Sequence, residues 1–147
     1  TMLDAVKIFC AGMSPLLAGI LFNYLLMYLP VWSLLMLLEI VLIAAWVYLA
    51  FKVSKSGKNP FIQASLLSAF GLLMLALALF QELVMGRYWL NLIGIGPQLF
   101  FLPFVTLASL ITVPFMDVIR PWPAYIVIWA CLFLTGWMGC WIKQRKA

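Results

Sequence analysis

The chain has 147 residues, of which 67% are hydrophobic and 9% are charged, with a net charge of +5. Soluble domains are about half apolar and a quarter charged, and a water-soluble fold of this length has too little interior to bury so much apolar side chain. The composition therefore excludes a soluble domain. It predicts one all-α integral membrane domain over residues 1–147.

The residue types present also narrow the range of functions. The chain contains no His, so it has no Ser–His or Cys–His nucleophile pair and lacks the commonest metal ligand. Cys10, Cys131 and Cys140 lie in apolar segments without Cys-x-x-Cys spacing and are expected to be packing residues. The basic residues are confined to a few spots, with no basic face and exposed aromatics for nucleic acid. We therefore expect no enzyme activity, no metal, no cofactor and no nucleic-acid partner.

Five apolar blocks follow one another along the chain, and each is long enough for a transmembrane helix, which needs about 20 residues. The longest clearly polar connection covers residues 52–60, and no connection has room for a soluble domain. Residues 1–7 lack the basic n-region and cleavage site of a signal peptide. The blocks cover residues 6–29, 31–51, 61–85, 90–116 and 124–142.

The first two blocks are separated only by a short segment around Pro30. Proline ends one helix and suits the start of the next. Tyr28 and Trp32 flank it, and such amphipathic rings favour the membrane–water boundary. The pattern predicts a tight antiparallel hairpin of two helices.

Basic residues predict the orientation. Lysines of the 52–60 connection and cations of the C-terminus are both expected on the cytoplasmic side, but five full crossings would place them on opposite sides. Five crossings put five basic residues inside and four outside, whereas seven lie inside and two outside if the fourth block does not cross. Those seven are Lys7, Lys52, Lys55, Lys58, Lys143, Arg145 and Lys146, and the two are Arg87 and Arg120.

The fourth block is also the most interrupted one. Gly94, Gly96 and Pro97 lie near its start, Pro103 lies within it and Pro114 near its end. Proline inside a helix removes a hydrogen bond and kinks or breaks it. We therefore expect four transmembrane helices plus a broken or re-entrant fourth block, in the cytoplasmic (inner) membrane with both termini cytoplasmic. The alternative is five transmembrane helices, whose weak bias would allow dual orientation and a two-fold antiparallel dimer.

Glu39 is the main candidate for a functional residue. It lies near the middle of the second block, close to the expected bilayer midplane, where a carboxylate costs about 3 kcal/mol or more to insert. Across the predicted hairpin, Asn23 lies within about 3 Å of the same depth. We expect a Glu39–Asn23 contact. It would be either a proton- or cation-linked site or a structural interhelical hydrogen bond.

Two further polar or small-residue patterns accompany Glu39. Ala11, Pro15, Gly19 and Asn23 recur every four residues, forming a ridge that predicts close helix packing or the wall of a cavity. Gln98, Thr106, Ser109 and Thr112 form one polar stripe on an ideal helix of the fourth block. Such hydroxyls either bond their own backbone or line a substrate path in a broken helix.

Charged residues at the ends of the blocks form two candidate boundary ion pairs, Glu82 with Arg87 and Asp117 with Arg120. They would anchor loop ends or form an external vestibule. Together these residues favour a transport-related protein, meaning a permease, channel or membrane-embedded solute-binding subunit. It would be a homo-oligomer or bind a partner membrane protein. The alternative is a non-catalytic accessory or assembly subunit of a larger membrane complex.

Overall fold

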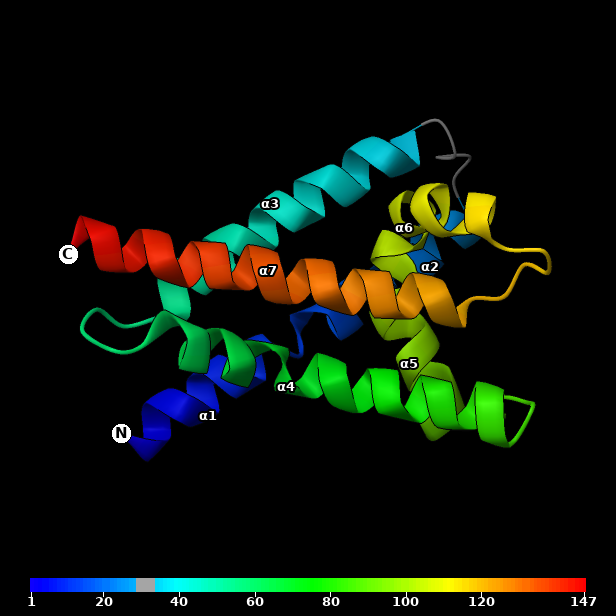
Figure 1. Ribbon diagram of the computed structural model, residues 1–147, viewed down its shortest axis with the longest axis horizontal. Coiled ribbons are helices and arrows are strands. Elements are labelled where there is room, and N and C mark those ends of the chain that lie inside the picture. The colour runs from blue at the N-terminus through cyan, green and yellow to red at the C-terminus, as the bar shows by residue number, and fades with distance from the viewer. Residues whose placement is uncertain (29–33) are drawn as a thin grey trace.

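The computed structural model describes residues 1–28 and 34–147, and every regular element in that part of the chain is a helix (Figure 1). The helices match the five apolar blocks, with the first and the fourth block each divided between two helices. The long elements are α1 Met2–Ala11, α2 Ser14–Tyr28, α3 Leu35–Val53, α4 Pro60–Leu79, α5 Leu92–Phe101, α6 Val105–Thr112 and α7 Trp122–Lys146. A π-helical turn, Phe80–Val84, extends α4, and 3₁₀ turns at Leu102–Phe104 and Val113–Phe115 flank α6.

By length and hydropathy, five helical stretches qualify as membrane spans, which confirms the predicted all-α membrane class. They are Met2–Tyr28, Leu35–Val53, Pro60–Val84, Leu92–Phe115 and Trp122–Lys146. No strand occurs in the described ranges.

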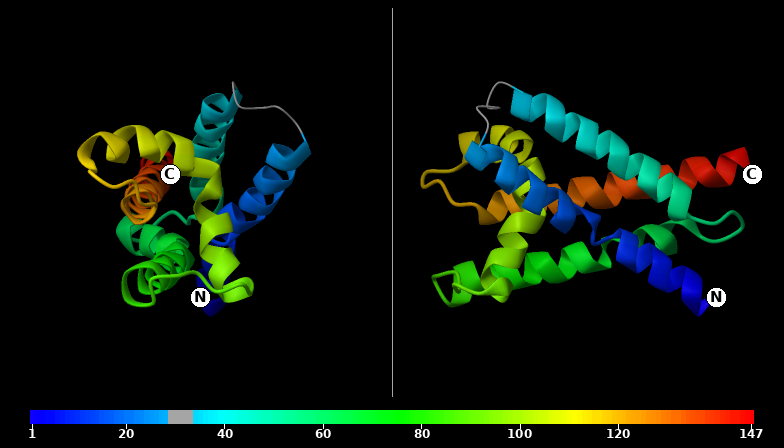
Figure 2. Two further views of the ribbon diagram at one scale, coloured as in Figure 1. Left: turned by 90° about the vertical axis from the view of Figure 1, so that its right-hand side faces the viewer. Right: turned by 180° about the vertical axis from the view of Figure 1, so that it is seen from behind.

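The fourth stretch, Leu92–Phe115, is arranged differently from the other four, and we call it the re-entrant segment. Viewed along the long axis of the molecule, α4 and α7 appear nearly end-on, whereas α5 and α6 are seen from the side (Figure 2). The connections that enter and leave the segment lie at the same end of the molecule, opposite both termini (Figure 1). The chain thus enters and leaves the broken fourth block at one end, as expected for a re-entrant block, while by length and hydropathy this stretch is one of the five candidate spans.

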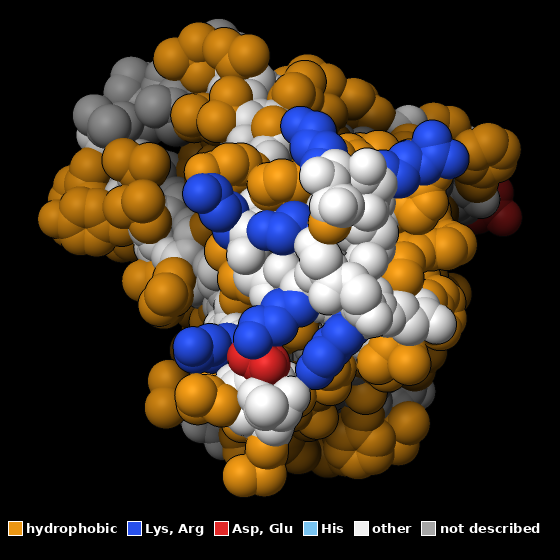
Figure 3. All heavy atoms as spheres, turned by 90° about the vertical axis from the view of Figure 1, so that its left-hand side faces the viewer, with side chains coloured by type: hydrophobic (Ala, Val, Ile, Leu, Met, Phe, Trp, Pro, Cys, Tyr) orange, Lys and Arg blue, Asp and Glu red, His pale blue; other side chains and the backbone are white. Residues whose placement is uncertain are grey.

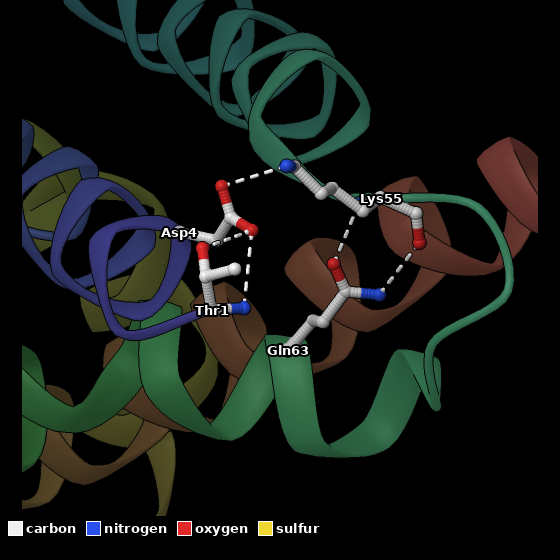
Figure 4. Close-up of polar contacts among 4 residues, drawn as sticks. All are labelled: Thr1, Asp4, Lys55 and Gln63. Atoms are coloured by element: carbon white, nitrogen blue, oxygen red, sulfur yellow. Dashed lines mark hydrogen bonds and ion pairs between the residues drawn. The ribbon is translucent and has the colours of Figure 1, made fainter.

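The end that carries both termini gathers Lys and Arg side chains on one face (Figure 3), and we call it the basic end. Three parts of the chain meet there through polar contacts. Lys55 Nζ lies 2.7 Å from Asp4 Oδ1, which joins α1 to the connection after α3 (Figure 4). The Gln144 amide of α7 donates to the carbonyls of Lys55 (2.7 Å) and Lys58 (2.6 Å). These contacts hold the connection that carries Lys55 and Lys58 against α1 and α7.

Two glutamines hold the backbone of the polar connection after α3. Gln63 is 3% exposed, accepts a hydrogen bond from Lys55 N and donates to the Lys55 carbonyl (Figure 4). It also donates to the Lys58 carbonyl. Gln144 Oε1 accepts from Gly57 N at 2.9 Å. The turn at Gly57 has a φ of +80°, a conformation that favours glycine. An amide suits this work because it both donates and accepts.

Helix α7 is the centre of the packing and lies between α3 and α4. Trp46 of α3 donates to the Leu132 carbonyl at 2.8 Å, and Trp129 donates to the Ser68 carbonyl of α4 at 3.1 Å. Gly139 lets α7 approach the α3 backbone, because a Cβ there would collide with the Val47 carbonyl.

Of the three free cysteines only Cys140 is buried in this core, as a packing residue should be. Cys10 and Cys131 are exposed, contrary to the packing role predicted for these two residues.

The predicted tight hairpin of the first two blocks is not present. Helix α2 packs against α5 and the turn after it, and α2 and α3 hardly touch (Figure 2). Proximity in sequence does not decide packing here because both helices are apolar on all sides and either face is compatible with lipid. The residues that suggested the hairpin turn, Pro30 and Trp32, lie outside the described residues.

Candidate functional site

Two prolines of the re-entrant segment, Pro97 within α5 and Pro103 in the turn after it, each free a backbone carbonyl. A proline cannot donate to the carbonyl four residues earlier, so Pro97 frees the Ile93 carbonyl and Pro103 frees the Leu99 carbonyl. Such groups at membrane depth must be satisfied or shielded by protein. The rest of the chain does this in two different ways.

The Ile93 carbonyl is bonded by Gln81, a fully buried residue at the π-helical end of α4. Gln81 Nε2 donates to the Ile93 oxygen at 3.1 Å, and Gln81 Oε1 accepts from Trp89 N at 3.0 Å. Gln81 therefore ties α4 to the start of the re-entrant segment. The sequence reasoning missed this residue, although a lone amide close to the end of an apolar block is a usable signal.

The Leu99 carbonyl is covered by Gly19 of α2. A Cβ built at Gly19 would overlap the Leu99 oxygen, so only glycine allows this approach. Pro15 and Gly19, two members of the predicted ridge, are buried, Ala11 is half-buried, and Asn23 is exposed. Gly19 therefore packs α2 against α5, whereas Pro15 lies in the wall of a groove between α2 and α3.

Glu39 occupies the N-terminus of α6, just after the break. Its carboxylate accepts from Thr106 N at 3.2 Å (Oε1) and from Leu107 N at 2.8 Å (Oε2), and the side chain is 0% exposed. The first N–H groups of a helix have no partner within it, and the positive end of the helix dipole favours an anion. A carboxylate only accepts and has two oxygens, so it matches two N–H groups. We call this arrangement the Glu39 cap.

The Glu39 cap lies towards one end of α3 and not at its middle. Four residues of α3 precede Glu39 and fourteen follow it, which places it about 6 Å from the first residue of the helix and about 21 Å from the last. Within α3 the carboxylate therefore lies in the half of the helix nearest to the re-entrant segment. Pro103 ends α5 at that depth and brings the start of α6 to it.

The predicted Glu39–Asn23 contact is absent. The hydrogen bonds of the carboxylate go to the α6 backbone, and Asn23 is exposed on α2, which does not pack against α3. The physical reason is that two free N–H groups at a helix terminus bind a carboxylate better than one amide side chain does.

The break divides the predicted polar stripe between two helices. Gln98 lies on α5 and donates to the Gly94 carbonyl of its own helix at 3.1 Å. On α6, Ser109 donates to the Thr106 carbonyl and Thr112 to the Ala108 carbonyl. Thr106 takes part in the Glu39 cap through its backbone.

The boundary charges do not pair as predicted. Glu82 accepts from the Tyr88 hydroxyl at 2.9 Å, while Arg87 is exposed. Burial, with Tyr125 and Glu82 nearby, raises the pKa of Tyr88 well above its ordinary value, which keeps this hydroxyl a donor. Asp117 and Arg120 are both exposed. Within the described ranges, Asp4 is the only acidic residue that forms an ion pair, with the N-terminal ammonium and with Lys55.

Two grooves lie beside the Glu39 cap, and both have mainly apolar walls. One, of about 330 Å³, lies between α2 and α3, and the other, of about 250 Å³, lies between α6 and α7. Phe104, in the turn after Pro103, lines both, and Leu107 lines the second. Glu39 itself lines neither of them. In the part of the chain that the structure describes, no three His, Cys, Asp or Glu side chains are grouped to hold a metal ion.

Comparison of the chain with models of known protein families, with curated proteins and with solved structures finds no match. The class of protein follows from the helices themselves. Five apolar helical stretches of membrane-spanning length define a polytopic membrane protein.

Proposed function

We propose that this chain is a transport-related membrane protein in which the re-entrant segment is the moving part and the Glu39 cap holds it closed. The observation that supports this best is a fully buried carboxylate on the N-terminus of a helix that starts at a break within the membrane. Ionisable residues in spans and broken helices both mark transport sites in membrane proteins. A second copy or a partner chain would complete the pathway.

Protonation supplies a chemical way to open the Glu39 cap. The ionised carboxylate accepts at both oxygens, whereas the protonated form carries an O–H that is a donor. One of the two N–H groups, on Thr106 or Leu107, then loses its acceptor. Release of α6 would move Phe104, which separates the two grooves.

Proton flux in liposomes tests this proposal. Purified protein is reconstituted around a pH-sensitive dye, and the decay of an imposed pH gradient is followed at several external pH values. We expect the wild type to dissipate the gradient faster than protein-free liposomes, and faster still as the pH falls. Glu39→Gln is expected to abolish this pH dependence because its amide cannot change charge.

Glu82→Gln is the matched control, since it makes the same chemical change at a carboxylate that lies away from α6. It should leave the pH dependence as in the wild type. Decay equal to that of protein-free liposomes at every pH, for the wild type with native helical content, contradicts the transport proposal.

The second candidate is a non-catalytic accessory or assembly subunit. It is favoured by the complete use of both Glu39 oxygens in hydrogen bonds to backbone, which is what a purely structural carboxylate does. On this proposal Glu39→Gln lowers thermal stability in detergent, and no variant changes proton flux.

We also propose that the basic end faces the cytoplasm, in the cytoplasmic membrane, because seven of nine basic residues follow the positive-inside rule in that orientation. Fusion of green fluorescent protein to the C-terminus should give fluorescent cells. Alkaline phosphatase inserted after Arg87 should be active, since that turn lies at the opposite end. A non-fluorescent C-terminal fusion together with inactive alkaline phosphatase after Arg87 would contradict the orientation. Each reporter is also tested at the other site, and activity of both reporters at both sites would indicate dual orientation.

A further inference from the structure

Helices α2 and α3 hardly touch (Figure 2), and a groove lies between them. Its walls are almost entirely apolar, and we call it the α2–α3 groove. Its lining comprises Ser14, Pro15 and Ala18 from α2, Phe104, and Leu42, Ala45, Trp46, Tyr48, Leu49 and Lys52 from α3.

The length of the α2–α3 groove matches one leaflet of a bilayer. Along α3 it runs from Leu42 to Lys52, ten residue steps, or about 15 Å at 1.5 Å per step. The hydrocarbon core is about 30 Å thick, so this is the depth of a single leaflet. Lys52 lies in the last turn of α3, at the basic end, and is therefore placed at the level of the headgroups.

The width of the groove selects among hydrophobic occupants. A volume of about 330 Å³ spread over about 15 Å gives a cross-section of roughly 20 Å². A helix with side chains is about 10 Å across, or roughly 80 Å², and does not fit. An extended hydrocarbon chain is about 4–5 Å across at van der Waals contact and does.

The polar groups at the groove are available for a ligand. Lys52 is exposed, and its ammonium lies 5.5 Å from the centre of the Tyr48 ring, with no carboxylate partner among the described residues. Ser14 has no hydrogen bond from its hydroxyl to any residue in the described ranges. An unpaired cation beside an interfacial tyrosine suits a lipid phosphate.

We propose that the α2–α3 groove binds one acyl chain of an anionic phospholipid from the leaflet at the basic end, with the lipid phosphate on Lys52. This site is separate from the Glu39 cap and goes beyond the proposed transport function. Apolar contact with α2 and α3 holds the chain, and the charge of Lys52 selects the headgroup.

Native mass spectrometry of the full chain in detergent tests the site. The protein is mixed with phosphatidylglycerol or phosphatidylcholine of equal chain length, and bound lipid is counted. The wild type should retain phosphatidylglycerol about fivefold better, the effect of one basic residue near the membrane surface. Lys52→Gln should remove this preference. Lys143→Gln, a basic residue at the same end but outside the groove, should keep it.

Filling the groove tests the acyl-chain part. Ala45→Phe should reduce retention of both lipids several-fold, and Ala18→Phe on the α2 wall does the same if the first variant fails to fold. Ala44→Phe is the control, because Ala44 is exposed on α3 but does not line the groove. Retention by Ala45→Phe and Ala18→Phe equal to that of Ala44→Phe, or equal headgroup preference in Lys52→Gln and Lys143→Gln, overturns the proposal. Neither result bears on proton flux, so the proposed function is tested separately.

Discussion

Gly19→Ala is expected to destabilise the protein by about 2 kcal/mol or more, the upper range for forcing extra atoms into a packed site. The added Cβ would overlap the Leu99 carbonyl oxygen, and neither atom belongs to a flexible side chain that could move aside. Helix α2 must then shift away from α5. The Leu99 carbonyl, already without its helical partner because of Pro103, loses its cover as well. Thermal unfolding in detergent, followed by circular dichroism, measures the loss.

Gly96→Ala is the matched control for this prediction. Gly96 is also a helical glycine of the same region, but a Cβ there would meet only the sulfur of Met74, at 3.9 Å. We expect its unfolding midpoint to stay near that of the wild type. Equal midpoints for the Gly19 and Gly96 variants would show that the α2–α5 contact does not support the re-entrant segment.

Glu39→Ala is expected to cost about 2–3 kcal/mol, because each buried N–H left without an acceptor costs about 1–3 kcal/mol and removal of a buried carboxylate offsets part of that. Glu39→Gln should lie between the alanine variant and the wild type. Its single amide oxygen can accept from Leu107 N or Thr106 N, but its NH₂ group faces the other donor. The order of unfolding midpoints in detergent tests this ranking.

Hydrogen exchange locates the same effect. In the alanine variant the first turn of α6 should exchange faster, while the Trp46 region of α3, which is held by α7, stays protected. An alanine variant as stable as the wild type would mean that the Glu39 cap contributes nothing to the fold. A glutamine variant less stable than the alanine variant would contradict the acceptor count on which the ranking depends.

The helical class, the apolar blocks and the break in the fourth one were predictable because each depends on local sequence. Runs of about 20 apolar residues indicate a membrane helix directly, and Pro103 lies at the break between α5 and α6, although α5 continues through Pro97. The distribution of basic residues even favoured the arrangement in which the fourth block starts and ends on one side. Charge and proline are readable from residue type alone.

The partner of Glu39 was not predictable, and the reason is general. Asn23 was predicted as the partner because its amide is visible in the sequence. The actual partners are the backbone N–H groups of Thr106 and Leu107, which follow Glu39 by 67 and 68 residues. Every residue except proline carries such a group, so sequence does not show which ones are free. The hairpin prediction failed similarly, because the packing of α2 on α5, with Gly19 against the Leu99 carbonyl, joins segments that are far apart in the sequence.

The sequence by itself determined that this is an all-helical membrane protein with a proline-broken fourth block and with basic residues confined to a few places, since hydropathy, charge and proline act locally. Only the tertiary structure decided which face of each apolar helix packs and where the Glu39 carboxylate goes. Lipid accepts any apolar face equally well, so the choice is made by close backbone approaches and by the few backbone groups that prolines leave free.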